Sequence, residues 1–280
     1  MSSRSFFEAQ QWAFSFVTKH GLEESGANML LYGEMGYSVT EFLMHMREPM
    51  PPENWCHFKN NIKLYCQGFP PQYLLGKSSF YGLELKVSPA VLIPRQETEE
   101  LVDWVLATND HAQKKVADIG TGSGAIGLAI KKYRPKWKVV LTDISAASLK
   151  VADENAATLH LDVSLCKGDL LSPLTGGPYD IIISNPPYID RAEKRMMDRS
   201  VLEHEPHLAL FAADNGLEIY RKIADQISNY IHRNSKLYVE IGYAQGRAVV
   251  GIFKNKFPLA EVILKRDLSG HDRMVQVIFK

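Results

Sequence analysis

The spacing of apolar residues changes partway along the chain. In the first part, apolar side chains recur every three or four residues, which is typical of amphipathic helices. This spacing predicts helices over residues 6–17 and 23–34, and a helix from Pro52 towards Gly68. Residues 38–41, Ser-Val-Thr-Glu, have the form of a capping box, so another helix should follow them. We therefore predict a small helical bundle.

The helical spacing ends at the Phe-Pro-Pro of residues 69–71. The partial alternation that follows predicts a β-hairpin over residues 78–93. Beyond it, short apolar runs alternate with helical patterns, which is typical of an α/β protein with a mostly parallel sheet. The chain should therefore contain a helical domain at 1–77, a hairpin linker at 78–93 and an α/β domain at 94–280.

Seven short apolar runs in the third part predict strands. They lie at residues 116–119, 139–141, 163–166, 181–183, 236–241, 261–265 and 274–279, with helices predicted near 216–230 and 245–257. A mostly parallel sheet of seven such strands gives a Rossmann-like fold, in which ligands bind at the carboxyl ends of the strands. Gly120, Asp143, Asp169 and Asn185 each fall at such an end, so we expect them to surround one crevice.

A glycine-rich loop follows the first of these strands. Residues 118–124 read Asp-Ile-Gly-Thr-Gly-Ser-Gly and lead into a helical pattern. Glycines allow a tight turn and let a ligand approach the backbone, and the next helix points its N-terminus at that ligand. Asp143, about 20 positions further on, is placed to accept hydrogen bonds from a ribose diol. The pattern predicts a nucleotide-type cofactor.

Two cofactors fit this pattern. Gly122-x-Gly124-x-x-Gly127 matches the dinucleotide fingerprint, so NAD is one candidate. Asp118 favours S-adenosylmethionine, because a carboxylate two residues before the first glycine can meet a methionine ammonium but would repel a pyrophosphate. A glycine-rich turn without a ligand is the remaining interpretation.

The strand at residues 181–183 stops at Asn185-Pro186-Pro187-Tyr188. Proline has a fixed φ and no N–H, so it cannot continue a central strand. The rigid tip that results can hold a planar amino or amide group, whose NH₂ would donate to the Asn185 side-chain oxygen and the Pro186 carbonyl, with its flat face near Tyr188. A hydride-transfer site needs no such tip, so the presence of the tip also favours methyl transfer. The alternative is a Pro-Pro turn with a tyrosine packed over it.

Charge and cysteine content narrow the class of protein. The formal net charge is zero, and the first 75 residues carry five Lys/Arg against seven Asp/Glu, which argues against a basic nucleic-acid-binding arm. Three cysteines without a C-x-x-C pair suit a reducing compartment and argue against a zinc site. No apolar run reaches the length of a membrane span. We expect a cytoplasmic protein without a metal.

The motifs together resemble the class I S-adenosylmethionine methyltransferases. Several flanking stretches are also similar to the peptide chain release factor glutamine methyltransferases. They are residues 71–76 (PQYLLG), 92–99 (LIPRQETE), 205–206 with 209–210, 240–243 (EIGY) and 267–270 (DLSG). The resemblance extends over nearly the whole chain, including the helical part and the hairpin.

The resemblance implies an enzyme that uses S-adenosylmethionine to methylate the glutamine of the Gly-Gly-Gln motif in release factors, giving N5-methylglutamine and S-adenosylhomocysteine. By position, it implies cofactor contacts from Asp118, Gly120, Thr121, Gly122, Ser123, Gly124, Asp143 and Asn185. It implies that Asn185, Pro186, Pro187 and Tyr188 hold the glutamine, and that Asn185, Pro186 and Tyr188 act in catalysis. The helical domain would then recognise the release factor, and we expect a monomer that does not bind nucleic acid.

One position departs from the family. An aromatic residue that lies against the adenine often follows the acidic residue at the end of the third strand, and here that position is Leu170. Leucine can pack on an adenine ring but cannot stack on it.

Two other methyl acceptors remain open, a glutamine of a ribosomal protein and the exocyclic amine of a nucleic-acid base. A non-catalytic module that binds cofactor and partner is the third interpretation, although a pure binder needs no Asn-Pro-Pro-Tyr tip.

Overall fold

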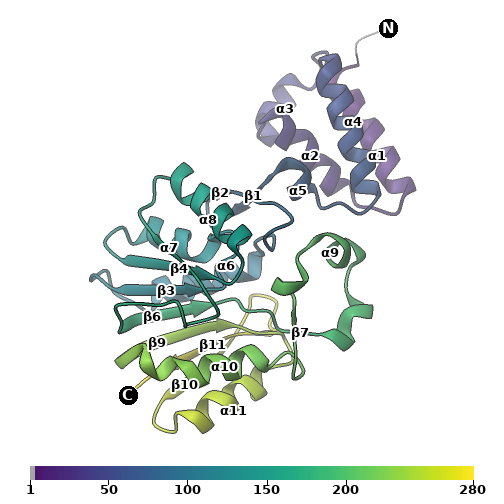
Figure 1. Ribbon diagram of the computed structural model, residues 1–280. Coiled ribbons are helices and arrows are strands. Elements are labelled where there is room, and N and C mark those ends of the chain that lie inside the picture. Colours follow the sequence, from purple (N-terminus) through teal and green to yellow (C-terminus); the bar gives the residue numbers. More distant parts are fainter. Residues whose placement is uncertain (1–3) are drawn as a thin grey trace. The chain divides into compact units, whose positions relative to one another are not determined.

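The computed structural model in Figure 1 describes residues 4–280, which form two compact units. The first unit contains residues 4–77 and 198–204, and the second contains residues 78–197 and 205–280. The hairpin predicted as a linker lies in the second unit, and a short segment far along the chain joins the first. Among the helices of residues 4–280, none combines the length and the apolar character that a membrane crossing needs.

The first unit is a bundle of helices. They are α1 (Phe6–Lys19), α2 (Glu24–Met35), α3 (Val39–His45), α4 (Pro52–Cys66), α5 (Pro71–Leu75) and α9 (Arg199–His204). Ser5 and Ser38 accept hydrogen bonds from the backbone N–H groups of Glu8 and Glu41, and both glutamates accept one in return. Both α1 and α3 therefore begin with a capping box. The helices predicted in this part of the chain are confirmed.

The apolar faces of these helices form a single core. Its fully buried side chains include Ala9, Ala13, Val17, Leu30, Leu31, Phe58 and Ile62. Helices α2 and α4 approach closely at Gly26, where a Cβ atom would lie 2.4 Å from the ring of Tyr65. Helix α9 belongs to this unit and stacks the ring of His204 on Phe69, with the ring centroids 4.0 Å apart.

The second unit is built on a seven-stranded sheet with the order β10-β11-β9-β6-β3-β4-β5. The strands are β3 (Lys115–Ile119), β4 (Lys138–Asp143), β5 (Ser164–Lys167), β6 (Tyr179–Ser184), β9 (Ile231–Glu240), β10 (Glu261–Arg266) and β11 (Asp272–Ile278). All neighbours run parallel except β11, which is antiparallel to β9 and β10. The predicted Rossmann-like, mostly parallel sheet is confirmed. Strand order reverses between β3 and β6, where such folds bind ligands.

Helices cover both faces of this sheet (Figure 1). Helices α6 (Gln96–Ala107), α7 (Ala125–Tyr133) and α8 (Ala146–Thr158) pack on one face, and α10 (Glu218–Gln226) and α11 (Gly246–Lys256) pack on the other. In β3, Val116 belongs to the first apolar core and Ala117 to the second, and Ile181 and Ile182 of β6 divide in the same way. Burial on both faces explains why these strands read as continuous apolar runs.

The β-hairpin is shorter than predicted. It consists of β1 (Lys77–Phe80) and β2 (Leu83–Lys86), and residues 87–93 form neither helix nor strand. Val91 and Ile93 are nevertheless buried, which produced the strand-like pattern in the sequence. Pro89 interrupts the strand, and the chain turns there because the N–H of Val91 donates to the carbonyl of Ser88.

The boundary between α10 and β9 also differs from the prediction. Helix α10 ends at Gln226, a 3₁₀ turn follows at Ile227–Asn229, and β9 begins at Ile231 instead of 236. The polar residues 232–234 hide the start of this strand in the sequence. The short strands β7 (Ile189–Asp190) and β8 (Phe211–Ala212) and the 3₁₀ helices Arg191–Met196 and His207–Ala209 were not predicted.

Asn155, in the last turn of α8, joins the hairpin to the glycine-rich loop. Its side-chain oxygen accepts from the N–H of Lys86 at 2.6 Å, and its NH₂ donates to the carbonyls of Lys86 at 3.0 Å and Ser123 at 2.9 Å. The side chain is buried, so water cannot replace these partners. One amide therefore fixes three segments of the second unit.

Replacing this amide should destabilise the fold. We expect Asn155→Ala to lower the free energy of unfolding by about 2–4 kcal/mol, because it removes three hydrogen bonds and leaves buried and partly buried backbone groups unpaired. Urea denaturation measures the change. Asn255→Ala, at an exposed position of α11, is the control and should change stability by less than about 0.5 kcal/mol. Equal effects of the two substitutions would contradict the role of Asn155.

Candidate active site

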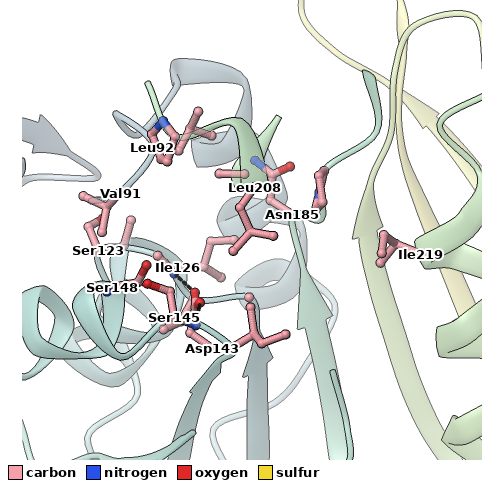
Figure 2. Close-up of a pocket in the computed structure, with 18 of the residues that line it drawn as sticks. Val91, Leu92, Ser123, Ile126, Asp143, Ser145, Ser148, Asn185, Leu208 and Ile219 are labelled. Atoms are coloured by element: carbon pink, nitrogen blue, oxygen red, sulfur yellow. Dashed lines mark hydrogen bonds between the residues drawn. The ribbon is translucent and has the colours of Figure 1, made fainter. Parts of the chain in front are cut away.

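A cavity of about 410 Å³ lies at the carboxyl ends of the parallel strands. Gly120, Asp143, Asp169 and Asn185 all line it, from the ends of β3, β4, β5 and β6. The prediction that these four residues surround one crevice is confirmed. Figure 2 shows the side chains of Asp143 and Asn185 around this space. Its apolar lining includes Val91, Leu92, Ile126, Ile144, Leu170 and Leu208.

The glycine-rich loop gives the cavity a wall of bare backbone. Gly120 and Gly122 have φ angles of +68° and +56°, which disfavour residues with a Cβ. Apart from the chain neighbours of each glycine, no heavy atom of residues 4–280 lies within 4 Å of a Cβ built at either position, so a ligand can approach the main chain there. Gly124 serves packing instead, because its Cβ would lie 2.8 Å from Leu128. Thr121 and Ser123 complete the loop's share of the lining.

Asp118 supports this loop from below. Its Oδ2 atom accepts hydrogen bonds from the Thr121 hydroxyl at 2.6 Å and from the N–H of Gly127 at 2.9 Å. The side chain is fully buried, and burial raises the pKa of this carboxyl to about 6 against the effect of both bonds. Asp118 thus lies beneath the loop and not on the cavity wall formed by the described residues. Its direct contact with a cofactor ammonium stays a prediction.

Asp143 presents a carboxylate on the cavity wall beside the loop. Its Oδ2 accepts from the N–H of Gly122 at 3.0 Å, and its Oδ1 accepts from the N–H of Ser145 at 2.8 Å. Burial raises the pKa of Asp143, while these backbone donors oppose the shift. Each oxygen keeps acceptor capacity for a hydroxyl group, and the neighbouring Ile144 is 50% exposed. S-adenosylmethionine suits this cavity. The Asp143 carboxylate can accept hydrogen bonds from its ribose diol, the apolar side chains can pack on its flat adenine ring, and the bare backbone of the glycine-rich loop allows its close approach.

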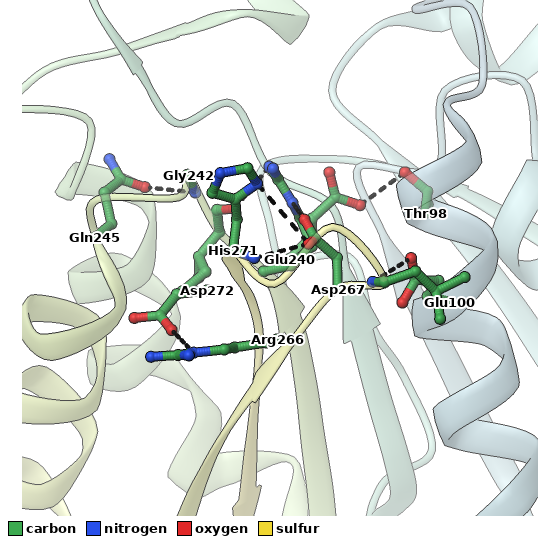
Figure 3. A network of polar contacts seen from close by, with 12 residues as sticks. Thr98, Glu100, Glu240, Gly242, Gln245, Arg266, Asp267, His271 and Asp272 are labelled. Atoms are coloured by element: carbon green, nitrogen blue, oxygen red, sulfur yellow. Dashed lines mark hydrogen bonds and ion pairs between the residues drawn. The ribbon is translucent and has the colours of Figure 1, made fainter.

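Asn185 ends a chain of buried and partly buried hydrogen bonds, part of which Figure 3 shows. Its Nδ2 donates to the hydroxyl of Thr98 at 3.0 Å, and that hydroxyl donates to Oε2 of Glu240 at 2.7 Å. The hydroxyl of Tyr188 donates to Oε1 of Glu240 at 3.4 Å. The chain connects the end of β6, helix α6 and the end of β9. It fixes the side-chain amide of Asn185 at the cavity wall.

The other residues of the Asn-Pro-Pro-Tyr tip lie at different depths. Pro187 lines the cavity together with Asn185. The ring of Tyr188 packs against the apolar core of the sheet, with its hydroxyl on Glu240, and the cavity lining formed by residues 4–280 includes neither Tyr188 nor Pro186. Direct contacts of these two residues with a substrate stay predictions. The structure shows Tyr188 as a support beneath the tip.

Arg95 and Glu205 form an ion pair at the cavity. An Nη atom of Arg95 lies 2.5 Å from Oε1 of Glu205, whose side chain is almost fully buried. Arg95 and the adjacent Pro206 both line the cavity. Arg95 therefore neutralises the charge of a buried carboxylate. Among the described residues, no group of three or more His, Cys, Asp or Glu side chains is arranged to hold a metal ion.

Sequence reasoning missed two residues of the site, Thr98 and Glu240. Both lie in stretches that carried the family resemblance, but neither had a chemical role assigned to it. One signal was available, because Glu240 follows the apolar run Leu237-Tyr238-Val239 and a charged residue ending a buried strand is uncommon. Thr98 gave no such signal, since a threonine in the first turn of a helix is common.

Both the helical part and the α/β part of the chain are similar to known proteins. Residues 98–209 match the family model of the methyltransferase small domain, and residues 8–76 match that of the PrmC N-terminal domain. A release factor glutamine methyltransferase of Enterococcus faecalis is 38% identical over 97% of this chain and 98% of its own length. Another, from Lactococcus lactis, is 48% identical over 83% of this chain and 86% of its own length.

A solved methyltransferase from Pyrococcus furiosus shares the fold, with a TM-score of 0.55 at 16% identity over 81% of this chain and 98% of that one. The fold, the cavity and these matches define an S-adenosylmethionine-dependent methyltransferase, and S-adenosylmethionine is its methyl donor. The identities to full-length relatives narrow the class further. The chain belongs to the release factor glutamine methyltransferase family.

The buried carboxyl of Asp118 should make stability depend on pH. Burial raises its pKa from 3.8 to about 6, so its stabilising contribution is complete below 3.8 and is lost as the pH rises through 6. Wild type should lose roughly 3 kcal/mol of unfolding free energy through this group, and Asp118→Asn should lack that loss. Urea denaturation of both proteins from pH 4 to 7 measures the difference between them. A difference independent of pH would contradict the assignment.

Proposed function

We propose that this protein transfers a methyl group from S-adenosylmethionine to the side-chain amide nitrogen of the glutamine in the Gly-Gly-Gln motif of peptide chain release factors. The products are N5-methylglutamine and S-adenosylhomocysteine. The observation that carries this proposal is the direction of the Asn185 amide. Its NH₂ is bonded to Thr98, which leaves its oxygen to accept hydrogen bonds in the cavity. An acceptor of this kind suits an NH₂ group on the substrate.

The chain's own residues divide the site between donor and acceptor. The glycine-rich loop and Asp143 would hold the cofactor, with the Asp143 carboxylate on its ribose and Ile144 and Leu170 against its adenine. Asn185 lies on the same cavity wall at the end of β6 and would hold the glutamine, together with the Pro186 carbonyl and Pro187. When bound, S-adenosylmethionine supplies an electrophilic methyl sulfonium.

Positioning carries the catalysis in this proposal. An amide nitrogen is a poor nucleophile, because its lone pair is delocalised into the carbonyl group. The Asn185 oxygen and the Pro186 carbonyl would accept both hydrogens of the glutamine NH₂ and fix the nitrogen in one place. Two acceptors also stabilise the positive charge that builds up on this nitrogen. The proton that restores a neutral amide leaves to water.

The proposal predicts the effect of removing the acceptor. Asn185→Ala should lower kcat for release factor methylation by about 100-fold, because the nitrogen is no longer fixed or its charge stabilised. Methyl transfer from labelled S-adenosylmethionine to a purified release factor measures kcat, with a Gly-Gly-Ala variant of the factor as the unlabelled control. Calorimetry should show that cofactor affinity is retained. Undiminished turnover of this variant would contradict the role of Asn185, and label on the Gly-Gly-Ala factor would contradict the acceptor.

The first unit would recognise the release factor. Helix α3 of this unit exposes Val39 and Leu43 at 59% each and Met44 at 65%. Val39 and Leu43 are four residues apart and share one helix face, which is how a helix presents apolar anchors to a partner. The formal net charge of zero supports a protein acceptor over a nucleic acid. That the protein acts as a monomer, as expected from the sequence, stays a prediction.

A charge on this face should weaken recognition without affecting the chemistry. We expect Leu43→Asp to raise KM for the release factor roughly tenfold, while kcat and cofactor affinity are retained. Leu259→Asp, at a leucine of the second unit that is 79% exposed, is the control and should leave KM unchanged. Steady-state methylation over a range of release factor concentrations measures both constants. Equal KM values for the two variants would show that α3 is not part of the recognition surface.

A further inference from the structure

The group that receives the methyl in the proposed function is an NH₂ group. Asn185 can bind this group only if its side-chain oxygen faces the cavity. An asparagine amide has a donor end and an acceptor end of almost the same shape, so a rotation of 180° exchanges them. With its NH₂ turned to the cavity, Asn185 would oppose the NH₂ of the substrate. Some neighbouring group must therefore determine which end faces inward.

The buried chain of hydrogen bonds supplies this determinant. A carboxylate only accepts, so the proton of the Thr98 hydroxyl must point to Glu240, where the two oxygens lie 2.7 Å apart. The Thr98 oxygen then offers only lone pairs to Asn185, which must answer with its NH₂, at 3.0 Å. Because Glu240 can only accept a hydrogen bond, it determines the direction of the Thr98 hydroxyl, and this hydroxyl in turn determines which end of the Asn185 amide faces the cavity.

Burial protects the bond between Thr98 and Glu240. Thr98 is 4% exposed and Glu240 is 2% exposed, so water is not available to replace either partner in this bond. If Glu240 carries a proton, it can donate to Thr98, and the Thr98 hydroxyl is then free to donate to the Asn185 oxygen. That reversal would turn the NH₂ of Asn185 into the cavity.

We propose that Glu240 is a positioning residue of the methyl-transfer site, which acts through Thr98 to keep the oxygen of Asn185 directed at the substrate NH₂. The inference rests on the proposed function for the identity of the acceptor. Within residues 4–280, Glu240 is not itself part of the cavity lining but bonds to Thr98, which is, and its role is to select an acceptor group that carries hydrogens on nitrogen.

Charged and titratable groups from several elements act on the Glu240 carboxyl group. The Tyr188 hydroxyl, Arg273 of β11 and Glu97 of α6 face its carboxylate, and the Tyr220 hydroxyl of α10 donates to its backbone carbonyl at 2.9 Å. Arg273 also bonds Asp267 at 3.1 Å, so its charge is shared. Burial raises the pKa of Glu240 to about 7, while the bond from Thr98, the charge of Arg273 and the bond from Tyr188 lower it and Glu97 raises it.

The first arm of the test removes and restores the Thr98 hydroxyl. Thr98→Val should lower kcat at least tenfold, and Thr98→Ser, which keeps the hydroxyl, should stay within threefold of wild type. Thr108→Val is the matched control, because Thr108 lies just beyond the C-terminal end of α6 and its hydroxyl bonds Tyr238 of β9 at 2.7 Å without reaching Asn185. This control should retain the kcat of wild type, and all three variants should retain cofactor affinity in calorimetry. Equal kcat for Thr98→Val and Thr108→Val would overturn the proposal.

The second arm varies pH in wild type and Glu240→Gln. The kcat of wild type should rise with pH through about 7 as Glu240 ionises, because only the ionised form holds Asn185 in the productive orientation. The Gln variant should have a lower kcat at pH 8 and should lack this rise. A Glu240→Gln variant with the kcat and pH profile of wild type would overturn the proposal.

A readout without any release factor separates this inference from the proposed function. In ¹⁵N spectra, the side-chain NH₂ signal of Asn185, assigned by its loss in Asn185→Ala, should shift with pH around 7 in wild type and not in Glu240→Gln. If the signal behaves so but no release factor is methylated, the proposed acceptor is wrong and the positioning role stands. If release factors are methylated but the signal and the Thr98 and Glu240 variants show no such dependence, the positioning role is wrong and the proposed function stands.

Discussion

The parallel pairing of β3 with β6 places the two halves of the site next to each other. Ile119 pairs with Ser184 in the register, and the Ser184 hydroxyl donates to the Ile119 carbonyl at 2.8 Å. The next residue of each strand is Gly120 on one side and Asn185 on the other. Because strand order reverses at this pair, the chain leaves β3 and β6 in different directions and opens the cavity between them. A shift of one residue in this register would separate the glycine-rich loop from the Asn-Pro-Pro-Tyr tip.

Buried carboxyl groups hold the cavity wall in shape. Asp118 supports the glycine-rich loop from below, Asp143 bonds it from the side, and Glu240 supports Asn185 through Thr98. Burial raises the pKa of all three groups. Each of them therefore lowers the stability of the fold near neutral pH when it is ionised. The site trades stability for fixed acceptors, as expected where a reaction depends on the orientation of polar groups.

Local features of the chain were readable in the sequence. The capping box at Ser38 and the glycine-rich loop could be assigned because each depends on neighbouring residues, whose spacing fixes backbone geometry. The apolar runs of β3 and β6 revealed a sheet buried on both faces. The start of β9 at Ile231 was missed because the polar residues 232–234 hide a strand that tertiary pairing stabilises.

The sequence by itself determined the Rossmann-like sheet, the glycine-rich loop and the position of Asn185 at a strand end, since periodicity and turn chemistry act over a few residues. Only the tertiary structure decided that Thr98 and Glu240, 142 residues apart, meet behind Asn185, and that Tyr188 turns into the core. It also decided that residues 198–204 join the helical unit. These features depend on which remote segments pack together, and no local spacing rule carries that information.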